Sequence, residues 1–175
     1  MVTTEIDEVN ERKLKLELRL AQLEKIESCQ QNFLEFVTKM WPDFIVGNHH
    51  KTVAEKFQKI ADGSLKRLII NMPPRHTKSE FASYLLPAWM MGNKPDMKIV
   101  QATHTTELAV SFGRKIKNLL EREEYLDVFP DAKLSKDSKA AGRWDTALGG
   151  MYYAVGVGSN LAGRGGDLIV IDDPH

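Results

Sequence analysis

The segment Arg67-Leu-Ile-Ile-Asn-Met-Pro-Pro-Arg-His-Thr-Lys-Ser-Glu80 decides the fold that the sequence predicts. Its apolar residues 68–70 indicate a buried strand, residues 72–77 a loop, and residues 80–86 the start of a helix. A loop between a strand and a helix can hold phosphate, because its backbone N–H groups and the helix N-terminus face the anion. In such loops a lysine reaches the β- and γ-phosphates and a serine ligates Mg²⁺. Lys78 and Ser79 stand at these two positions.

The loop departs from the usual glycine pattern of phosphate loops. When G-x-x-x-x-G-K-[ST] is aligned on Lys78 and Ser79, Met72 and Thr77 fall where glycine is expected. A surface turn with an incidental Lys-Ser pair is therefore an alternative interpretation of this segment.

A second informative segment, Asp167-Leu-Ile-Val-Ile-Asp-Asp173, lies near the end of the sequence. Its four apolar residues followed by two carboxylates have the form of a Walker B strand. In that interpretation Asp172 holds Mg²⁺, and Asp173 orients or deprotonates the water that attacks the γ-phosphate. A strand followed by a polar turn is the alternative, but the two segments together favour an ATPase core.

The composition indicates one folded domain. Of the 175 residues, 42% are apolar and 27% charged, as in soluble globular chains. The 24 basic and 24 acidic residues cancel, which argues against an autonomous DNA-binding module. A single cysteine, Cys29, excludes an internal disulfide. No run of 18 apolar residues occurs and acidic residues appear by position 5, so we expect a cytoplasmic chain without a membrane span.

The N-terminal residues 1–40 are expected to form a helical segment, either one long helix or two shorter ones, because residues 4–40 lack Gly and Pro. Lys13 interrupts the apolar stripe and Leu14 and Leu18 fall off it, so the pattern is a poor coiled coil. A charged helix lying on the domain and an arm for oligomerisation or a partner are both open interpretations.

The middle of the chain predicts an α/β fold with a parallel sheet. Residues 98–102 indicate a second buried strand and residues 105–124 a helix with an apolar face. Residues 143–157 indicate a β-hairpin that turns at Gly149 and Gly150. Pro87 should kink or stop the helix that follows the loop near Leu86.

These segments together resemble the ATPase domain of the large terminase subunit of tailed bacteriophages. The resemblance covers the chain from about Phe33 to its last residue, and its motifs are Pro73-Pro-Arg-His-Thr-Lys-Ser-Glu80, Pro87-Ala-Trp89, Tyr125 to Pro130 and Leu161 to Pro174. The family often has Pro-Pro-Arg-His-Gly-Lys-Ser in the loop, so Thr77 replaces a glycine. The added Cβ lies where backbone must approach phosphate, so we expect a reduced affinity for nucleotide.

The resemblance implies a three-layer α/β sandwich with an additional-strand P-loop NTPase core, formed by residues 41–175. It implies an ATP-hydrolysing motor that uses ATP and Mg²⁺ to pump double-stranded DNA into a capsid. Its partners would be the portal, the small terminase subunit and further copies in a homo-oligomeric ring, in the host cytoplasm at the procapsid portal, with no membrane.

The site expected from the motifs and the resemblance has three parts. The metal would be held by Ser79 and Asp172. The catalytic residues would be Lys78, Asp173, Arg75 and Arg164, and the nucleotide-binding residues Pro74, Arg75, His76, Thr77, Lys78, Ser79 and His50. Arg75 is a candidate sensor of the γ-phosphate.

Two of these residues have alternative roles. His50 or its neighbour His49 would read the adenine edge, as a similar element does in the terminase family, or would simply cap a helix. Arg164, placed between glycines just before the strand at residues 168–171, is a candidate arginine finger that reaches a neighbouring subunit, or a surface residue paired with Asp167.

Two rival functions share these motifs. A helicase or recombination ATPase has the same core, and an assembly piece with vestigial motifs would not use nucleotide at all. We also expect an incomplete protein, because the sequence ends two residues after Asp173 while Walker B strands lie inside their sheets. A shortened chain, a split gene or an inserted splicing element would each explain such an end.

Overall fold

The computed structural model describes residues 2–138, 140–159 and 165–174, with side chains from residue 10 onward. In chain order the helices and strands are α1 (Val2–Gln31), α2 (Phe33–Met40), α3 (Asn48–Ala61), the π-helix η1 (Glu80–Leu85), α4 (Leu86–Asn93), β1 (Lys98–Thr103), α5 (Thr106–Leu120), α6 (Glu123–Val128), β2 (Arg143–Asp145), β3 (Met151–Gly156) and β4 (Leu168–Asp172). None of the described helices is both long and apolar enough to cross a membrane.

The strands form one mixed sheet in the order β2-β3-β1-β4. The central strand β1 is parallel to both β3 and β4, and β2 pairs antiparallel with β3 as a hairpin. The α/β class, the strand at residues 98–102, the hairpin and the strand that ends at Asp172 are therefore confirmed. The sheet is not wholly parallel, because the Gly-Gly turn reverses the chain between β2 and β3.

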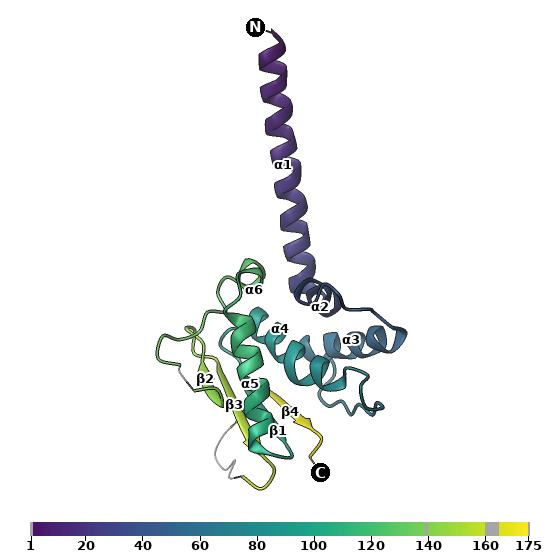
Figure 1. Cartoon of the computed structure of the whole chain (residues 1–175), viewed down its shortest axis with the longest axis vertical. Helices are drawn as coiled ribbons and strands as arrows, with labels where there is room; N and C mark the ends of the chain where they lie inside the picture. The colour runs from purple at the N-terminus through teal and green to yellow at the C-terminus, as the bar shows by residue number, and fades with distance from the viewer. Residues whose placement is uncertain (1, 139, 160–164, 175) are drawn as a thin grey trace.

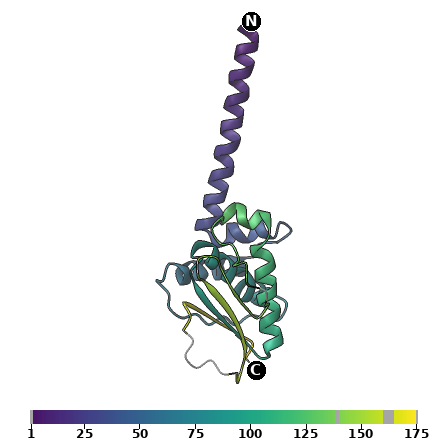
Figure 2. The ribbon, with the colours of Figure 1, turned by 90° about the vertical axis from the view of Figure 1, so that its left-hand side faces the viewer.

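One face of the sheet is covered by helices (Figure 2). On that face Tyr152 donates a hydrogen bond of 3.2 Å to the carbonyl of Ala109 in α5, and Trp144 donates one of 3.1 Å to the carbonyl of Gly113. The opposite face carries Ile169 and Ile171, which are 61% and 64% exposed. Because no described helix lies on that face, the described residues form two layers.

The apolar residues 68–70 do not form the strand that the sequence predicts. Leu68 and Ile70 pack against the core, but Ile69 between them is 88% exposed. Side chains alternate as in an extended chain. A strand also needs a neighbour to which its backbone can bond, and among the described residues the edge strand β4 is paired with β1 alone. The apolar run therefore remains a partly exposed segment without ladder bonds.

Phe33 is at the centre of the helical part of the core. Its ring makes edge contacts, with centroids 5.3–5.6 Å apart, to the rings of Phe57, Phe81 and Trp89. The Trp89 indole donates a 2.9 Å hydrogen bond to the carbonyl of Cys29. This cluster joins α1, α2, α3, η1 and α4, so the segment at residues 33–40 belongs to the folded body.

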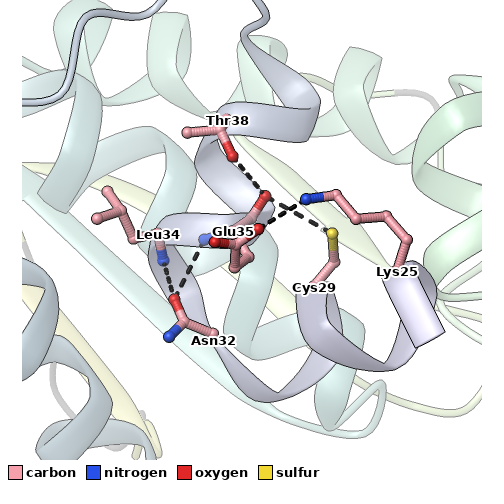
Figure 3. A network of polar contacts seen from close by, with 6 residues as sticks. All are labelled: Lys25, Cys29, Asn32, Leu34, Glu35 and Thr38. Atoms are coloured by element: carbon pink, nitrogen blue, oxygen red, sulfur yellow. Dashed lines mark hydrogen bonds and ion pairs between the residues drawn. The ribbon is translucent and has the colours of Figure 1, made fainter.

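A polar network fixes the corner between α1 and α2 (Figure 3). Asn32 caps α2, because its side-chain oxygen accepts hydrogen bonds from the backbone N–H groups of Leu34 and Glu35 at 2.9 and 3.1 Å. The Glu35 carboxylate forms a 2.7 Å ion pair with Lys25 of α1. The prediction of helix in the N-terminal segment is confirmed, with a break at Asn32.

Most of α1 extends beyond the body as a single projecting helix (Figure 1). Residues 10–25 are all exposed, and burial begins only at Ile26 and Ser28 and is complete at Cys29. The interpretation in which this helix lies along the domain is therefore wrong for residues 10–25.

Gly113 provides a stability test for the packing of α5 on the sheet. A Cβ at Gly113 would lie 2.5 Å from the carbonyl oxygen of Ala141 and 2.6 Å from Tyr152. Helix propensity alone favours Gly113→Ala by about 0.5–1 kcal/mol, but we expect a loss of about 1–3 kcal/mol from overpacking. Urea unfolding measures both this variant and Asn118→Ala, an exposed control on the same helix that should be neutral or slightly stabilising. A more stable Gly113→Ala protein would contradict the packing described.

Candidate functional site

The helix after the loop starts at Lys78 with an α-type bond, from the N–H of Phe81 to the carbonyl of Thr77, and becomes a π-helix at Glu80. In η1 the backbone bonds span five residues, as where the N–H of Leu86 bonds to the carbonyl of Phe81. Pro87, which has no N–H, then falls in the first turn of α4. The helix does not stop near Leu86 as predicted, because it changes there from π- to α-helix and continues to Asn93. Short π-helical segments occur frequently at functional sites.

The loop contains two residues in the left-handed backbone region. Arg75 has a φ of 63° and Thr77 a φ of 62°. This conformation costs about 1–2 kcal/mol for residues other than glycine, which explains why glycine is the usual residue at the position of Thr77. The Thr77 hydroxyl compensates in part, because it donates to the carbonyl of His76 at 2.6 Å and accepts from His50 Nε2 at 2.8 Å.

His50 connects this loop to the start of α3. Its Nδ1 accepts a 2.9 Å hydrogen bond from the backbone N–H of Gly47, the residue before the helix. Since Nδ1 accepts and the Thr77 hydroxyl proton is used elsewhere, Nε2 carries the proton and the ring is neutral. The geometry supports the helix-capping alternative, and adenine recognition by His50 stays a prediction.

Burial of His50 should make stability depend on pH. Burial lowers the pKa of His50 below 6.5, and the nearby His49 and His76 lower it further. The unfolded chain then binds more protons than the folded chain between the lowered pKa and 6.5, so the free energy of unfolding falls as pH decreases through this window. Urea unfolding from about pH 7.5 to about pH 5 should give a flatter profile for His50→Gln. An unchanged slope would contradict this origin.

Lys78 contacts both carboxylates at the end of β4. Its Nζ lies 3.4 Å from Asp172 Oδ1 and donates a hydrogen bond to Asp173 Oδ1. The hydrogen bond to Asp173 and the charge of Asp172 raise the pKa of Lys78. Asp172 is 6% exposed, whereas the side chain of Asp173 is 70% exposed. The structure therefore brings together the lysine and the two acidic residues that the sequence places in separate motifs.

Ser83 is a site residue that the sequence reasoning missed. Its hydroxyl, fully buried in η1, donates a 2.9 Å hydrogen bond to Asp172 Oδ2. With this oxygen fixed, Oδ1 of the same carboxylate faces Lys78. The only signal in the sequence was a small polar residue within the apolar run Phe81-Ala-Ser-Tyr-Leu-Leu86.

Loss of the Ser83 hydroxyl should destabilise the fold. Ser83→Ala removes a donor to a buried carboxylate, and we expect a loss of about 1–3 kcal/mol. The matched control is Ser111→Ala, whose exposed hydroxyl bonds only to the carbonyl of Leu108 in its own helix; its change should stay within about 0.5 kcal/mol. Chemical denaturation of both variants makes the comparison. Equal small losses would show that Asp172 does not depend on Ser83.

The remaining predicted loop residues lie at the surface or at its edge. Pro74, Arg75 and His76 are exposed, and His76 Nδ1 lies 2.9 Å from the carbonyl oxygen of Pro74. Ser79 is half-buried directly before η1. Beside the loop is a narrow hollow lined by His50, Val53, Ile70, Met72, His76, Thr77, Lys78 and Phe81. The space among these side chains does not admit a water molecule, so a base could enter it only after some of them had moved.

Arg164 lies outside the described residues. Asp167, its alternative partner, uses one carboxylate oxygen to accept a 2.8 Å hydrogen bond from the backbone N–H of Lys98. This bond joins the segment before β4 to the start of β1.

The donor set fits Mg²⁺ only if phosphate completes it. Hydroxyl and carboxylate oxygens, as in Ser79 and Asp172, are the protein ligands that Mg²⁺ prefers. Within the part of the chain that the structure describes, no three His, Cys, Asp or Glu side chains are grouped so as to hold a metal ion alone. A metal here would therefore share its coordination with nucleotide phosphates and water.

No protein-family model matches the chain, and no significant similarity to a curated protein or to a solved structure was found.

Proposed function

We propose that this chain belongs to an ATP-hydrolysing motor that translocates double-stranded DNA, of the kind found in the large terminase subunit of tailed bacteriophages. The observation that supports it best is the contact of Lys78 with Asp172 and Asp173. Two motifs that lie 95 positions apart in the sequence meet where a loop precedes a helix and a parallel strand ends. Ligands of α/β proteins bind at this edge of the sheet.

In this proposal ATP, the attacking water and Mg²⁺ each have a place among the site residues. The phosphates of ATP would compete with Asp173 for Lys78, because the lysine directly follows the loop and is hydrogen-bonded to that carboxylate. Once Lys78 turns to the phosphate, the exposed carboxylate of Asp173 is free to orient a water molecule for attack in line with the leaving group. Asp172, held by Ser83, stays in place during this exchange. Mg²⁺ on Ser79 and Asp172 would neutralise phosphate charge.

The finer assignments belong to the same proposal. They comprise an additional-strand P-loop core completed to three layers, a γ-phosphate contact by Arg75, and an arginine finger, Arg164, that acts on a neighbouring subunit of a ring. The portal and the small terminase subunit would be partners at the procapsid portal. A helicase or recombination ATPase would use the same site residues and would differ in the surface along which it moves nucleic acid.

Nucleotide binding tests the proposal on the chain as it stands. We expect Mg²⁺ with a non-hydrolysable ATP analogue to raise the melting temperature of the unmutated chain, since a ligand present at about 100 times its Kd adds about 2.7 kcal/mol. Lys78→Ala should lose the shift. Lys115→Ala is the control, because Lys115 pairs with Glu80 at 2.6 Å beside the site and not with the carboxylates of β4.

The ligand-induced shifts are compared, not the melting temperatures themselves, because Lys78→Ala also leaves the buried Asp172 without its cation. An unmutated chain that shows no shift at millimolar nucleotide would favour the vestigial assembly piece. A full shift in Lys78→Ala would refute the assignment of the loop.

A further inference from the structure

Residues 6–24, in the projecting part of α1, follow a heptad pattern in which Lys13 occupies one of the a positions. With Lys13 at an a position, the a positions are Ile6, Lys13 and Leu20 and the d positions are Val9, Leu16 and Leu23. A single polar residue at an a position is a common feature of coiled coils, where it sets register and the number of strands. Lys13, the residue that interrupts the apolar stripe, is therefore a candidate for setting the register of a coiled coil.

The part of the stripe whose side chains the structure describes is exposed. Leu16, Leu20 and Leu23 are 71%, 57% and 47% exposed. Glu27, the next a position, is exposed where the helix meets the body, so the stripe does not turn into the core. A helix in water that buries no apolar face is only marginally stable, and most helical stability in proteins comes from packing of that face. Packing of the stripe against a partner helix would supply this stability.

The charged residues that flank the stripe favour a second copy of the same helix as its partner. The g positions hold Arg12 and Arg19, and the e positions hold Glu17 and Glu24. In a parallel pair of identical helices each g residue faces the e residue of the next heptad on the other chain. Arg12 then faces Glu17 and Arg19 faces Glu24, so both contacts are attractive in each direction.

An antiparallel pair would be unfavourable. That arrangement places g opposite g and e opposite e, which sets arginine against arginine and glutamate against glutamate. The intrahelical pairs of α1 do not compete strongly, since Lys13 and Glu17 lie 3.9 Å apart with both side chains mostly exposed.

We infer that α1 is a homodimerisation arm, in which residues 6–24 of two copies of this chain form a parallel, in-register, two-stranded coiled coil. The surface that pairs is the a/d stripe with its flanking arginines and glutamates. Both folded bodies then lie at the same end of the pair, because each body follows its own α1. The inference is independent of the nucleotide site and goes beyond the proposed motor activity.

The mass of the whole chain in solution provides the first test. Sedimentation equilibrium should give about twice the chain mass of 19.8 kDa at high micromolar concentration. Leu16→Glu with Leu23→Glu places charge at two d positions and should weaken dimerisation at least about tenfold. The matched control is Leu14→Glu with Leu18→Glu, at outer b and f positions with similar exposure of 56% and 57%, and it should stay dimeric. An unmutated chain that remains a monomer would overturn the inference.

Charge exchange tests the pairing itself. A chain with Arg12→Glu and Arg19→Glu, or one with Glu17→Arg and Glu24→Arg, should be monomeric alone because every g–e contact becomes repulsive. An equimolar mixture should recover dimers, since all these contacts are attractive between the two variants. Dimers of either variant alone, as stable as the unmutated dimer, would contradict the charge pairing.

Orientation is tested by a disulfide. Lys13→Cys places two thiols at facing a positions only in a parallel, in-register pair, so mild oxidation should cross-link it efficiently. Leu14→Cys at a b position should cross-link poorly. The native Cys29 is fully buried in the body and does not interfere. Efficient cross-linking at position 14 but not at position 13 would exclude the proposed register.

Discussion

The site depends on one buried carboxylate. Asp172 ends a strand on the helix-covered face of the sheet, where an unpaired charge would be costly, and burial is tolerated only because Ser83 and Lys78 occupy its two oxygens. These contacts connect β4 to the start of η1, segments far apart in the sequence. The position of Lys78 is thus set by the folding of the sheet. The need to pair this buried charge on folding therefore also fixes Lys78 beside the end of β4.

The sequence predicted the elements whose evidence is local. The apolar run of β4 and the Gly-Gly turn of the hairpin were correctly identified. Lys78 meets Asp172 although the apolar run before its loop forms no strand. Residues 68–70 show the limit, because an apolar run indicates burial but contains no information about a ladder partner. Ser83 was missed for a related reason: its partner is a carboxylate 89 positions away.

Thr77 shows how a departure from a motif can be stabilised by a residue elsewhere. The sequence indicated a Cβ in place of a glycine, and the structure adds the left-handed backbone that makes glycine the usual choice. His50, buried at the start of α3, bonds the threonine hydroxyl and ties the loop to a helix that the motif does not include. This long-range compensation could not be read from the loop alone. It also gives the buried His50 a structural role beside the loop at residues 72–77.

Because α1 projects from the folded body, pairing through α1 would bring two bodies close to each other. A helix of 30 residues rises about 1.5 Å per residue, so it holds its tip roughly 45 Å from its base. Two chains joined along such helices would hold their bodies at an effective concentration in the millimolar range, whatever their concentration in solution. Weak contacts, such as one through the exposed face of Ile169 and Ile171, would then form between joined bodies although separate bodies at the same dilution would remain apart.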